Sequence, residues 1–340
     1  MRALALFLVA CGGSSTPAVD AGPDGPPALV APAGQWTYLP QANTTCGDGS
    51  PAGLALNPAP AATTDLIVYF EGGGACWDAT TCFQIKSAIR IDTPYDDAAF
   101  QSELPGIQAF GPFQRTGTPF AGANMAYVPY CTGDVHDGTA VQQYTFSGQQ
   151  KTVHHTGGTN AVTFASLLHS TYPDAKRIWI MGSSAGGYGA TLQLPTFAST
   201  WPDAEVHVLQ DSALFVPDML DATAKLGAWQ LMLPPGVTSQ ADVMPALETQ
   251  HPTTRIGLLT YDDDATLEAF EGYAKGTLAA AIDTLVANAY AKPSTHVFEL
   301  AGSTHTMLGS YATLAGPGGV KLSDWVAQWA TGDAAWTTVK

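Results

Sequence analysis

The residues Arg177-Ile-Trp-Ile-Met-Gly-Ser-Ser-Ala-Gly-Gly-Tyr-Gly-Ala190 join an apolar run typical of a buried strand to small residues suited to a helix. Gly182 and Gly186 lie two positions before and after Ser184, where a sharp turn from strand to helix leaves no room for Cβ atoms. This spacing predicts a nucleophile elbow with Ser184 at its apex and the amide of Ala185 directed at the position of an oxyanion. A Gly- and Ser-rich loop is the alternative interpretation, but the preceding strand favours the elbow and therefore acyl transfer.

The length and composition predict one large α/β domain. A chain of 340 residues that is 46% hydrophobic can bury a large core, and no polar spacer divides its middle. The 13 Lys and Arg residues against 29 Asp and Glu residues give a net charge of −16. This charge disfavours nucleic acid, anionic membrane surfaces and polyanionic substrates as partners.

The N-terminus has the features of an export signal. Residues 1–10 carry one basic residue and an apolar run too short to span a bilayer, and Cys11 follows a small residue as in a lipoprotein signal. Residues 11–33 are expected to form a lipidated cysteine and a disordered tether rich in Gly, Pro, Ser and Ala. A plain cleaved signal is the alternative. The catalytic domain is expected over 34–340, in a protein that is either secreted or held at the membrane only by this lipid.

The cysteines indicate an oxidising compartment. Of the five cysteines, four follow Cys11, an even number consistent with two disulfides. Four cysteines allow three pairings, of which we favour Cys76 with Cys82 across a small loop and Cys46 with Cys131. A zinc site is the competing interpretation, but the sequence has no C-x-x-C pair and no histidine nearby at a ligand spacing, so no metal is expected.

Apolar runs alternate with helical patterns, which predicts an α/β-hydrolase-like fold in a single domain, with a mostly parallel central sheet and helices on both faces. The expected strands cover 36–39, 66–70, 125–128, 177–181, 206–209, 256–259 and 297–300. The expected helices include 157–168, 267–289 and 322–330. Functional sites gather at the carboxyl ends of the strands in such a sheet, and the polar clusters of this chain follow the strands.

A serine nucleophile needs a base to accept its proton and a carboxylate to orient that base. His305 is the first choice of base, because it follows the last strand in the chain order Ser, Asp, His that α/β-hydrolases use. The penultimate strand could deliver Asp262, Asp263 or Asp264, and Asp262 is preferred as the first acid after the strand; Asp211 is a further candidate. The competing histidines are His136, His154, His155, His169, His207, His251 and His296.

A second oxyanion donor is expected from Glu71-Gly72-Gly73-Gly74, directly after the strand 66–70. Lipases place a glycine-rich run at this position, and its amides approach the oxyanion. The run is a poor phosphate-binding loop, because the G-x-G-x-x-G spacing and the P-loop lysine are both missing. No cofactor is therefore expected.

Together these motifs resemble the pectin acetylesterase family, which includes plant pectin acetylesterases and Notum-like carboxylesterases. The resemblance covers about Cys46 to His305. The matching motifs are Cys46-Gly-Asp-Gly-Ser-Pro51, Tyr69-Phe-Glu-Gly-Gly-Gly-Ala-Cys76 with Cys82, Val128-Pro-Tyr-Cys131, Phe146-Ser-Gly148, Gly182-Ser-Ser-Ala-Gly-Gly187, Asp211-Ser212, Tyr261-Asp262 and His305. The resemblance implies an α/β-hydrolase fold, a triad of Ser184, Asp262 and His305, and oxyanion amides from Gly73, Gly74 and Ala185.

The chain departs from the family pattern near the expected substrate site. Ala75 stands where the family usually has Trp, and Ser147 where it has Arg. Asp264-Ala265 replaces a Trp-Gln pair after the acid, and Thr306-Met307 replaces a Cys-Gln pair after the histidine. These changes leave the expected catalytic residues in place, but they leave the identity of the substrate open.

The expected function is therefore an exported serine esterase, a monomer that hydrolyses carboxylic esters through an acyl-enzyme. Candidate substrates are acetylated polysaccharides, lipid-like acyl esters and polyesters. Trp77, Tyr130 and Tyr188 lie in or beside the motif loops and are expected to line the substrate cleft. One alternative is a non-catalytic surface lipoprotein that kept the fold as a binding module. Another is a metal-dependent hydrolase. Its candidate ligands would be Asp134, His136, His154 and His155, but their spacing matches no metal site with a known mechanism.

Overall fold

The structure is a computed structural model, and it describes residues 25–217 and 222–340. The predicted signal sequence, Cys11 and the first part of the predicted tether lie outside the described residues. Among the helices that the structure describes, none combines the length and the apolar character needed to cross a bilayer.

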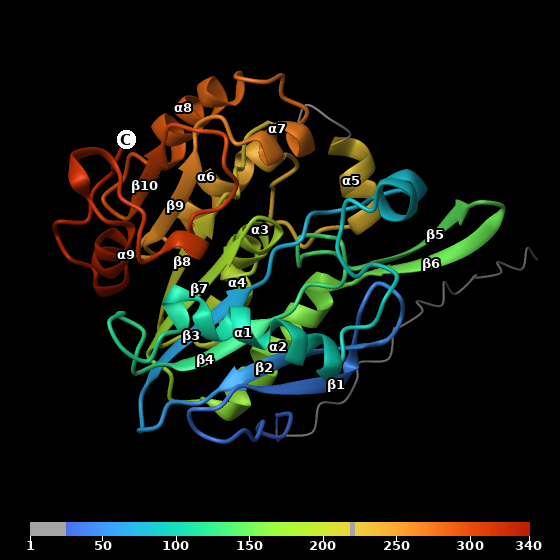
Figure 1. Cartoon of the computed structure of the whole chain (residues 1–340), viewed down its shortest axis with the longest axis horizontal. Helices are drawn as coiled ribbons and strands as arrows, with labels where there is room; N and C mark the ends of the chain where they lie inside the picture. The colour runs from blue at the N-terminus through green and yellow to red at the C-terminus, as the bar shows by residue number, and fades with distance from the viewer. Residues whose placement is uncertain (1–24, 218–221) are drawn as a thin grey trace, which may run out of the picture.

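A central sheet organises the molecule (Figure 1). Its strands are, in spatial order, β1 (Thr37–Thr45), β2 (Pro51–Asn57), β4 (Asn124–Val128), β3 (Asp65–Phe70), β7 (Arg177–Ser183), β8 (Glu205–Asp211), β9 (Ile256–Tyr261) and β10 (Thr295–Leu300). The pairs β1/β2 and β2/β4 are antiparallel, whereas every neighbouring pair from β4 to β10 is parallel. The predicted mostly parallel sheet is therefore confirmed.

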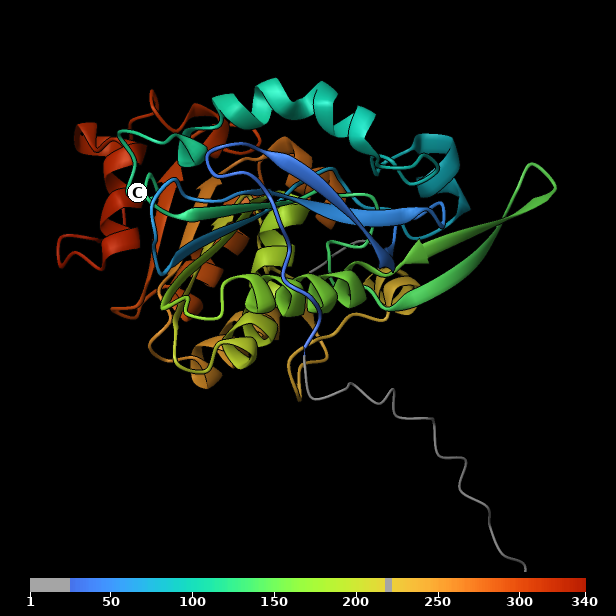
Figure 2. The same ribbon diagram turned by 90° about the horizontal axis from the view of Figure 1, so that it is seen from below.

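Helices cover both faces of this sheet. The α-helices are α1 (Asp97–Ala109), α2 (Gly157–Thr171), α3 (Ala185–Leu192), α4 (Leu194–Thr200), α5 (Ala222–Trp229), α6 (Val243–Gln250), α7 (Ala265–Glu271), α8 (Leu278–Ala289) and α9 (Leu322–Thr331). Shorter helical turns are η1 (Thr80–Ile85), η2 (Gly111–Phe113), η3 (Gln240–Asp242), η4 (Leu308–Ser310) and η5 (Pro317–Gly319). Figure 2 shows α1 and α2 on opposite sides of the sheet.

The central strand β3 shows why two helical layers form. All residues from Leu66 to Phe70 are buried, as their continuous apolar run predicts. Successive side chains of a strand point to opposite faces. Tyr69 accordingly packs against Phe110 beside α1, at 4.8 Å between ring centroids, whereas Phe70 packs against Phe197 of α4, at 6.2 Å. Both faces of the strand therefore lie in the core.

Two local features differ from the sequence-based expectation. The predicted helix 267–289 is divided into α7 and α8, because Gly272 ends α7 with a left-handed φ of 75°. A hairpin of β5 (Ala140–Phe146) and β6 (Gln149–His155) projects from the body (Figure 1). Exposed residues of β5 alternate with partly or fully buried ones, and both strands are mainly polar, so they lack the continuous apolar run of the central strands.

Candidate active site

Ser184 occupies a strained turn between β7 and α3. Its backbone has φ 56° and ψ −127°, a conformation that costs a residue other than Gly roughly 1–3 kcal/mol. A Cβ on Gly182 would lie 2.1 Å from the carbonyl oxygen of Gly186, and a Cβ on Gly186 would lie 2.0 Å from that of Phe70. Only glycine fits at these two positions. The elbow geometry expected from the spacing is therefore present.

His305 lies in the loop after β10 and is paired with Asp264. The histidine Nδ1 is 2.8 Å from one carboxylate oxygen of Asp264 and 3.0 Å from the other. An ionised carboxylate only accepts hydrogen bonds, so Nδ1 carries the proton and Nε2 keeps its lone pair. Within the described residues, Nε2 is buried and has no hydrogen-bond partner. The nitrogen that a general base uses is therefore available.

The acid beside His305 is thus Asp264 and not Asp262, which corrects the expectation from the sequence. The carboxylate of Asp262 accepts a hydrogen bond from the Gly302 amide at 2.8 Å. The reason is that pairing between the two strands continues past the end of β9: the amide of Asp262 donates to Leu300, and that of Asp263 donates to the Gly302 carbonyl. The chain turns toward His305 only at Asp264, the fully buried N-cap of α7.

Asp211, at the end of β8, joins the nucleophile to the histidine loop. Its backbone carbonyl accepts the Ser184 amide at 2.7 Å. Its buried carboxylate accepts the amides of Met307 at 2.7 Å and Leu308 at 3.0 Å, which lie two and three residues after His305. The hydroxyl of Ser183 also donates to this carboxylate, at 2.6 Å. Burial raises the pKa of Asp211, and these hydrogen bonds oppose that shift. The sequence offered Asp211 as a possible triad acid, whereas the structure gives it this anchoring position.

The glycine-rich loop after β3 lies against the elbow. A Cβ on Gly72 would be 2.4 Å from the Ser183 carbonyl oxygen and 3.1 Å from the Cβ of Ser184. Gly73 and Gly74 have positive φ values of 152° and 76°. In the part of the chain that the structure describes, the amides of Gly73, Gly74 and Ala185 donate to no protein acceptor. These free amides fit the oxyanion hole expected from the sequence.

A cavity of about 310 Å³ lies beside Ser184. Ser184, Tyr188 and Leu192 line it along α3, so it follows the helix for roughly 12 Å at 1.5 Å per residue. Its volume is at the lower end of the roughly 300–1,000 Å³ of small-molecule sites. The other walls are mainly apolar and include Phe215, Leu226, Trp229, Leu231, Leu233, Val243, Leu267 and Phe270. The cavity is suited to an aliphatic group attached to the reacting carbonyl.

The three aromatic residues expected in the substrate cleft have different positions. Tyr188 lines the cavity, and its hydroxyl is bonded to Glu271 and to the Leu214 carbonyl. Trp77 does not line it, because Trp77 lies behind Trp229, with ring centroids 6.2 Å apart. Tyr130 is fully buried outside the cavity, and its hydroxyl accepts the Val135 amide at 2.9 Å. Sequence alone did not reveal which way these rings point.

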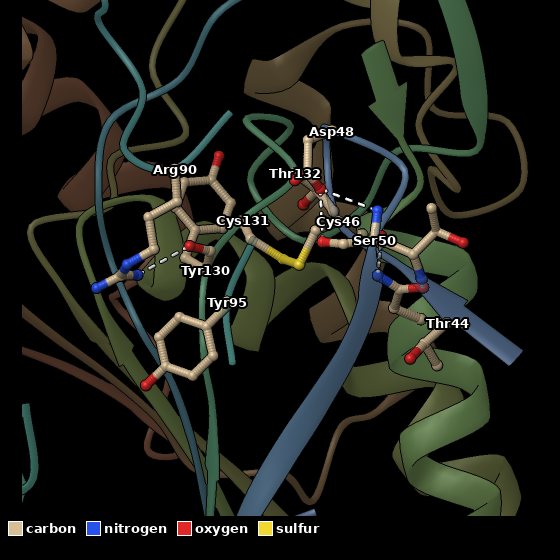
Figure 3. Close-up of a disulfide and its surroundings, with 12 residues drawn as sticks. Thr44, Cys46, Asp48, Ser50, Arg90, Tyr95, Tyr130, Cys131 and Thr132 are labelled. Carbon is tan, nitrogen blue, oxygen red and sulfur yellow. Dashed lines mark hydrogen bonds between the residues drawn. A yellow bond between two sulfur atoms is a disulfide. The ribbon is translucent and has the colours of Figure 1, made fainter. Parts of the chain in front are cut away.

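Both favoured disulfides are present. Cys76 is bonded to Cys82, and Cys46 to Cys131. Figure 3 shows the Cys46–Cys131 bridge beside Tyr130, whose carbonyl accepts a hydrogen bond from Arg90 at 2.9 Å. The Cys76–Cys82 bridge lies just after the glycine-rich loop, and the Cys46–Cys131 bridge holds the segment that follows β4. Two disulfides are typical of exported proteins.

Two of the histidines considered for a metal-dependent hydrolase, His136 and His155, are engaged in other contacts. Nε2 of His136 bonds to the Glu71 carbonyl oxygen at 2.7 Å, and Nδ1 of His155 bonds to the Thr132 carbonyl oxygen at 2.8 Å. His155 does lie near Cys76 and Cys82, with ligand-type atoms within 4.8 Å of one another. That proximity could not be read from the sequence spacing, and both sulfur atoms belong to the disulfide.

Comparison with known proteins agrees with this geometry. The family model "Pectinacetylesterase" matches residues 32–228. The mouse (Mus musculus) palmitoleoyl-protein carboxylesterase NOTUM is 29% identical over 186 residues, 51% of this chain and 34% of the relative. Pectin acetylesterase 11 of Arabidopsis thaliana is 29% identical over 192 residues, 53% of this chain and 46% of the relative. The chain thus matches about a third to a half of the length of these relatives.

A solved structure extends the similarity in fold. The structure of the Wnt deacylase Notum from Drosophila superposes with a TM-score of 0.62 and 19% identity, covering 88% of this chain and 93% of that one. The fold is therefore that of Notum. The family match ends before Asp264 and His305, so the roles of these two residues rest on the geometry described above. The chain belongs to the pectinacetylesterase family.

Proposed function

We propose that this protein is an exported serine esterase in which Ser184, His305 and Asp264 form the catalytic triad. The observation that carries the proposal is the anchoring of the Ser184 elbow and the His305 loop to the same residue, Asp211, beside an apolar cavity. The N-terminal signal pattern and the two disulfides support export, with Cys11 as the lipidated residue.

In the first half-reaction, Ser184 Oγ attacks the ester carbonyl carbon while His305 Nε2 accepts the serine proton. The amides of Gly73, Gly74 and Ala185 stabilise the negative charge on the carbonyl oxygen. Collapse of this intermediate breaks the bond to the alcohol oxygen, which takes the proton from His305, and leaves an acyl-enzyme. His305 then accepts a proton from water, the hydroxide attacks the acyl carbon, and Ser184 leaves with the proton as the carboxylic acid forms.

The cavity favours an aliphatic acyl group longer than acetyl. An acetyl group would leave most of the 310 Å³ beside Ser184 unfilled, whereas a longer chain would bury its methylenes against the apolar walls. Among the three candidate substrate classes, lipid-like acyl esters and aliphatic polyesters therefore fit best. The curated relatives include enzymes named for palmitoleoyl groups as well as a pectin acetylesterase, so the names in this family cover both a long and a short acyl group.

Substitution of Leu192 is expected to change the preferred acyl length, because Leu192 lines the cavity two helical turns from Ser184. Leu192→Trp should lower kcat/KM for p-nitrophenyl octanoate by roughly 50-fold, since excluding about three methylenes removes about 0.8 kcal/mol each. Leu192→Ala should instead move the optimum to longer chains. A p-nitrophenyl ester series from acetate to palmitate measures both shifts. Equal losses on acetate and octanoate would show that the acyl chain does not occupy this cavity.

The net charge of −16 is expected to influence which esters are preferred according to the charge of their alcohol part. Neutral acetylated xylan should have a higher kcat/KM than de-methylated acetylated pectin, because long-range repulsion slows encounter with a polyanion. The difference should narrow as salt is raised, since the Debye length is about 8 Å at physiological ionic strength. Rates for both polymers over a range of ionic strength provide the measurement. A preference for the pectin at low salt would reveal a local basic site that overrides the net charge.

A further inference from the structure

A strained turn beside the glycine-rich loop has no role in the mechanism above. Val135 and His136 both have left-handed backbone, with φ values of 55° and 60°, which costs roughly 1–3 kcal/mol for each residue. The fully buried carboxylate of Asp134 holds the turn, accepting the hydroxyl of Thr132 at 2.6 Å and the amide of Gly157 at 2.6 Å. Strained backbone that the surroundings hold this firmly concentrates at functional sites.

The turn presents the ring of His136 to the glycine-rich loop. Its Nε2 lies 2.7 Å from the carbonyl oxygen of Glu71, and a carbonyl only accepts, so Nε2 carries the proton. Burial lowers the pKa of His136 to about 4, which keeps the ring neutral at pH 7. The ring packs against Tyr130 and Phe70, with centroids 4.6 and 5.1 Å apart. A Cβ on Gly189 of α3 would lie 2.7 Å from the His136 Cβ. The imidazole is therefore fixed between the nucleophile helix and the glycine-rich loop.

The orientation of the Glu71 carbonyl affects the whole loop, because the three residues that follow it are glycines with few backbone restrictions. Other bonds hold Glu71 in place: its amide donates to the Val128 carbonyl, and its carboxylate binds Arg90. Neither bond fixes the ψ angle that directs the Glu71 carbonyl. Two residues later, the Gly73 carbonyl accepts the Ile89 amide at 2.9 Å.

The peptide unit between these two anchored carbonyls carries the Gly73 amide. No hydrogen bond to it is found among the described residues. Each anchored carbonyl fixes the plane of its own peptide unit, so together they fix the Cα atoms at the two ends of the unit between them and limit it to rotation about the line that joins those atoms. Without the bond from His136, the bond from the Ile89 amide would be the one hydrogen bond left, among the described residues, to the carbonyls of residues 71–73.

We propose that His136 is a positioning residue of the oxyanion hole: its Nε2–H fixes the Glu71 carbonyl and thereby holds the Gly73 amide toward the developing oxyanion. The inference rests on the proposed serine mechanism, in which this amide stabilises the transition state. Loss of the bond should therefore lower kcat while leaving substrate binding unchanged.

Two amide substitutions separate this role from a structural one. Gln at position 136 can place its side-chain nitrogen near the position of the histidine Nε2, whereas Asn is one methylene too short to reach the Glu71 carbonyl. We expect His136→Gln to keep kcat within about 5-fold of wild type. We expect His136→Asn to lose roughly 10- to 100-fold in kcat, less than the 10²–10³-fold for removing an oxyanion donor outright. KM should stay within about 3-fold for both, and affinity for an alkyl boronic acid, a tetrahedral mimic, should fall in parallel with kcat.

A purely structural role predicts the opposite order. Asn tolerates a left-handed φ better than Gln, so backbone strain at position 136 favours the Asn variant in stability and folding. His155→Asn is the matched control, because His155 is also buried and bonds to a backbone carbonyl in the same turn, that of Thr132. Its kcat should stay within about 3-fold of wild type.

The outcomes separate the two proposals. Wild-type protein that a fluorophosphonate does not label at Ser184 would overturn the serine mechanism and this inference with it. Labelled wild type with His136→Asn at least as active as His136→Gln, or with His155→Asn equally impaired, would overturn the inference alone. Should neither position-136 variant fold, Gly189→Ala replaces them, since its methyl group would displace the His136 ring. The same loss of kcat at constant KM is expected, and an unchanged kcat would contradict the proposal.

Discussion

Replacing Ser184 by Ala is expected to lower kcat for p-nitrophenyl esters by roughly 10⁵- to 10⁶-fold, the scale seen when a serine hydrolase loses its nucleophile. Without the hydroxyl, no acyl-enzyme can form, although the oxyanion amides and the cavity remain. Ala fits the elbow, because it adds no atom to a turn already crowded by Gly182 and Gly186. Steady-state rates and covalent labelling by a fluorophosphonate probe, with the melting temperature as a check on folding, measure the effect.

Ser183 offers a matched control one residue away. Its hydroxyl donates to the Asp211 carboxylate at 2.6 Å and accepts the Tyr69 hydroxyl at 3.0 Å, so it is engaged in the core and is not free to attack an ester. Ser183→Ala should therefore still be labelled at Ser184. Labelling that survives Ser184→Ala, or that disappears in Ser183→Ala, would contradict the assignment. Wild-type protein inert toward every ester in the series would instead favour the binding-module alternative.

The parts of the site that could be predicted from sequence are those fixed by local geometry. Gly182 and Gly186 are required within a few residues of Ser184, because a Cβ at either position would lie only 2.1 or 2.0 Å from a backbone oxygen. The glycine-rich loop could be placed because it follows the continuous apolar run of β3, and His305 could be placed because it follows the last strand of the chain. Strand ends in a parallel sheet converge at one edge, so order along the chain was enough to bring these elements together.

The parts that could not be predicted depend on contacts between distant segments. The walls of the cavity combine α3 and α7 with residues from the segments 215–217 and 225–243, and no periodic pattern indicates which side chains meet there. Trp77 and Tyr130 belong to the motif loops, yet their rings turn into the core. The bond from His136 to Glu71 joins residues 65 positions apart. A sequence shows that a buried histidine is present, but not which carbonyl it meets.

Asp264→Asn is expected to lower kcat by roughly 10⁴-fold, as for the corresponding change in other serine triads. The new amide would donate a hydrogen bond to His305 Nδ1 and so place the proton on Nε2, the wrong nitrogen for a base. The substitution should be mild for folding, since Asn is as good an N-cap as Asp and can still accept from the amides of Thr266 and Leu267. Single-turnover labelling by a fluorophosphonate should slow in parallel, because that reaction needs the same base.

Asp262→Asn is the control that decides between the two acids. Its side-chain oxygen can still accept the Gly302 amide, and the residue has no bond to His305, so kcat should stay within about 3-fold of wild type. A 10⁴-fold loss in Asp262→Asn with an active Asp264→Asn would restore the acid that the sequence favoured. The hydrogen-bonded pairing that extends β9 ends between these two residues. The amides of Asp262 and Asp263 still donate to carbonyls at the end of β10 and just after it, whereas the Asp264 side chain caps α7 and contacts His305. The carboxylate that meets His305 is therefore set by where the strand pairing stops and not by which carboxylate comes first along the chain.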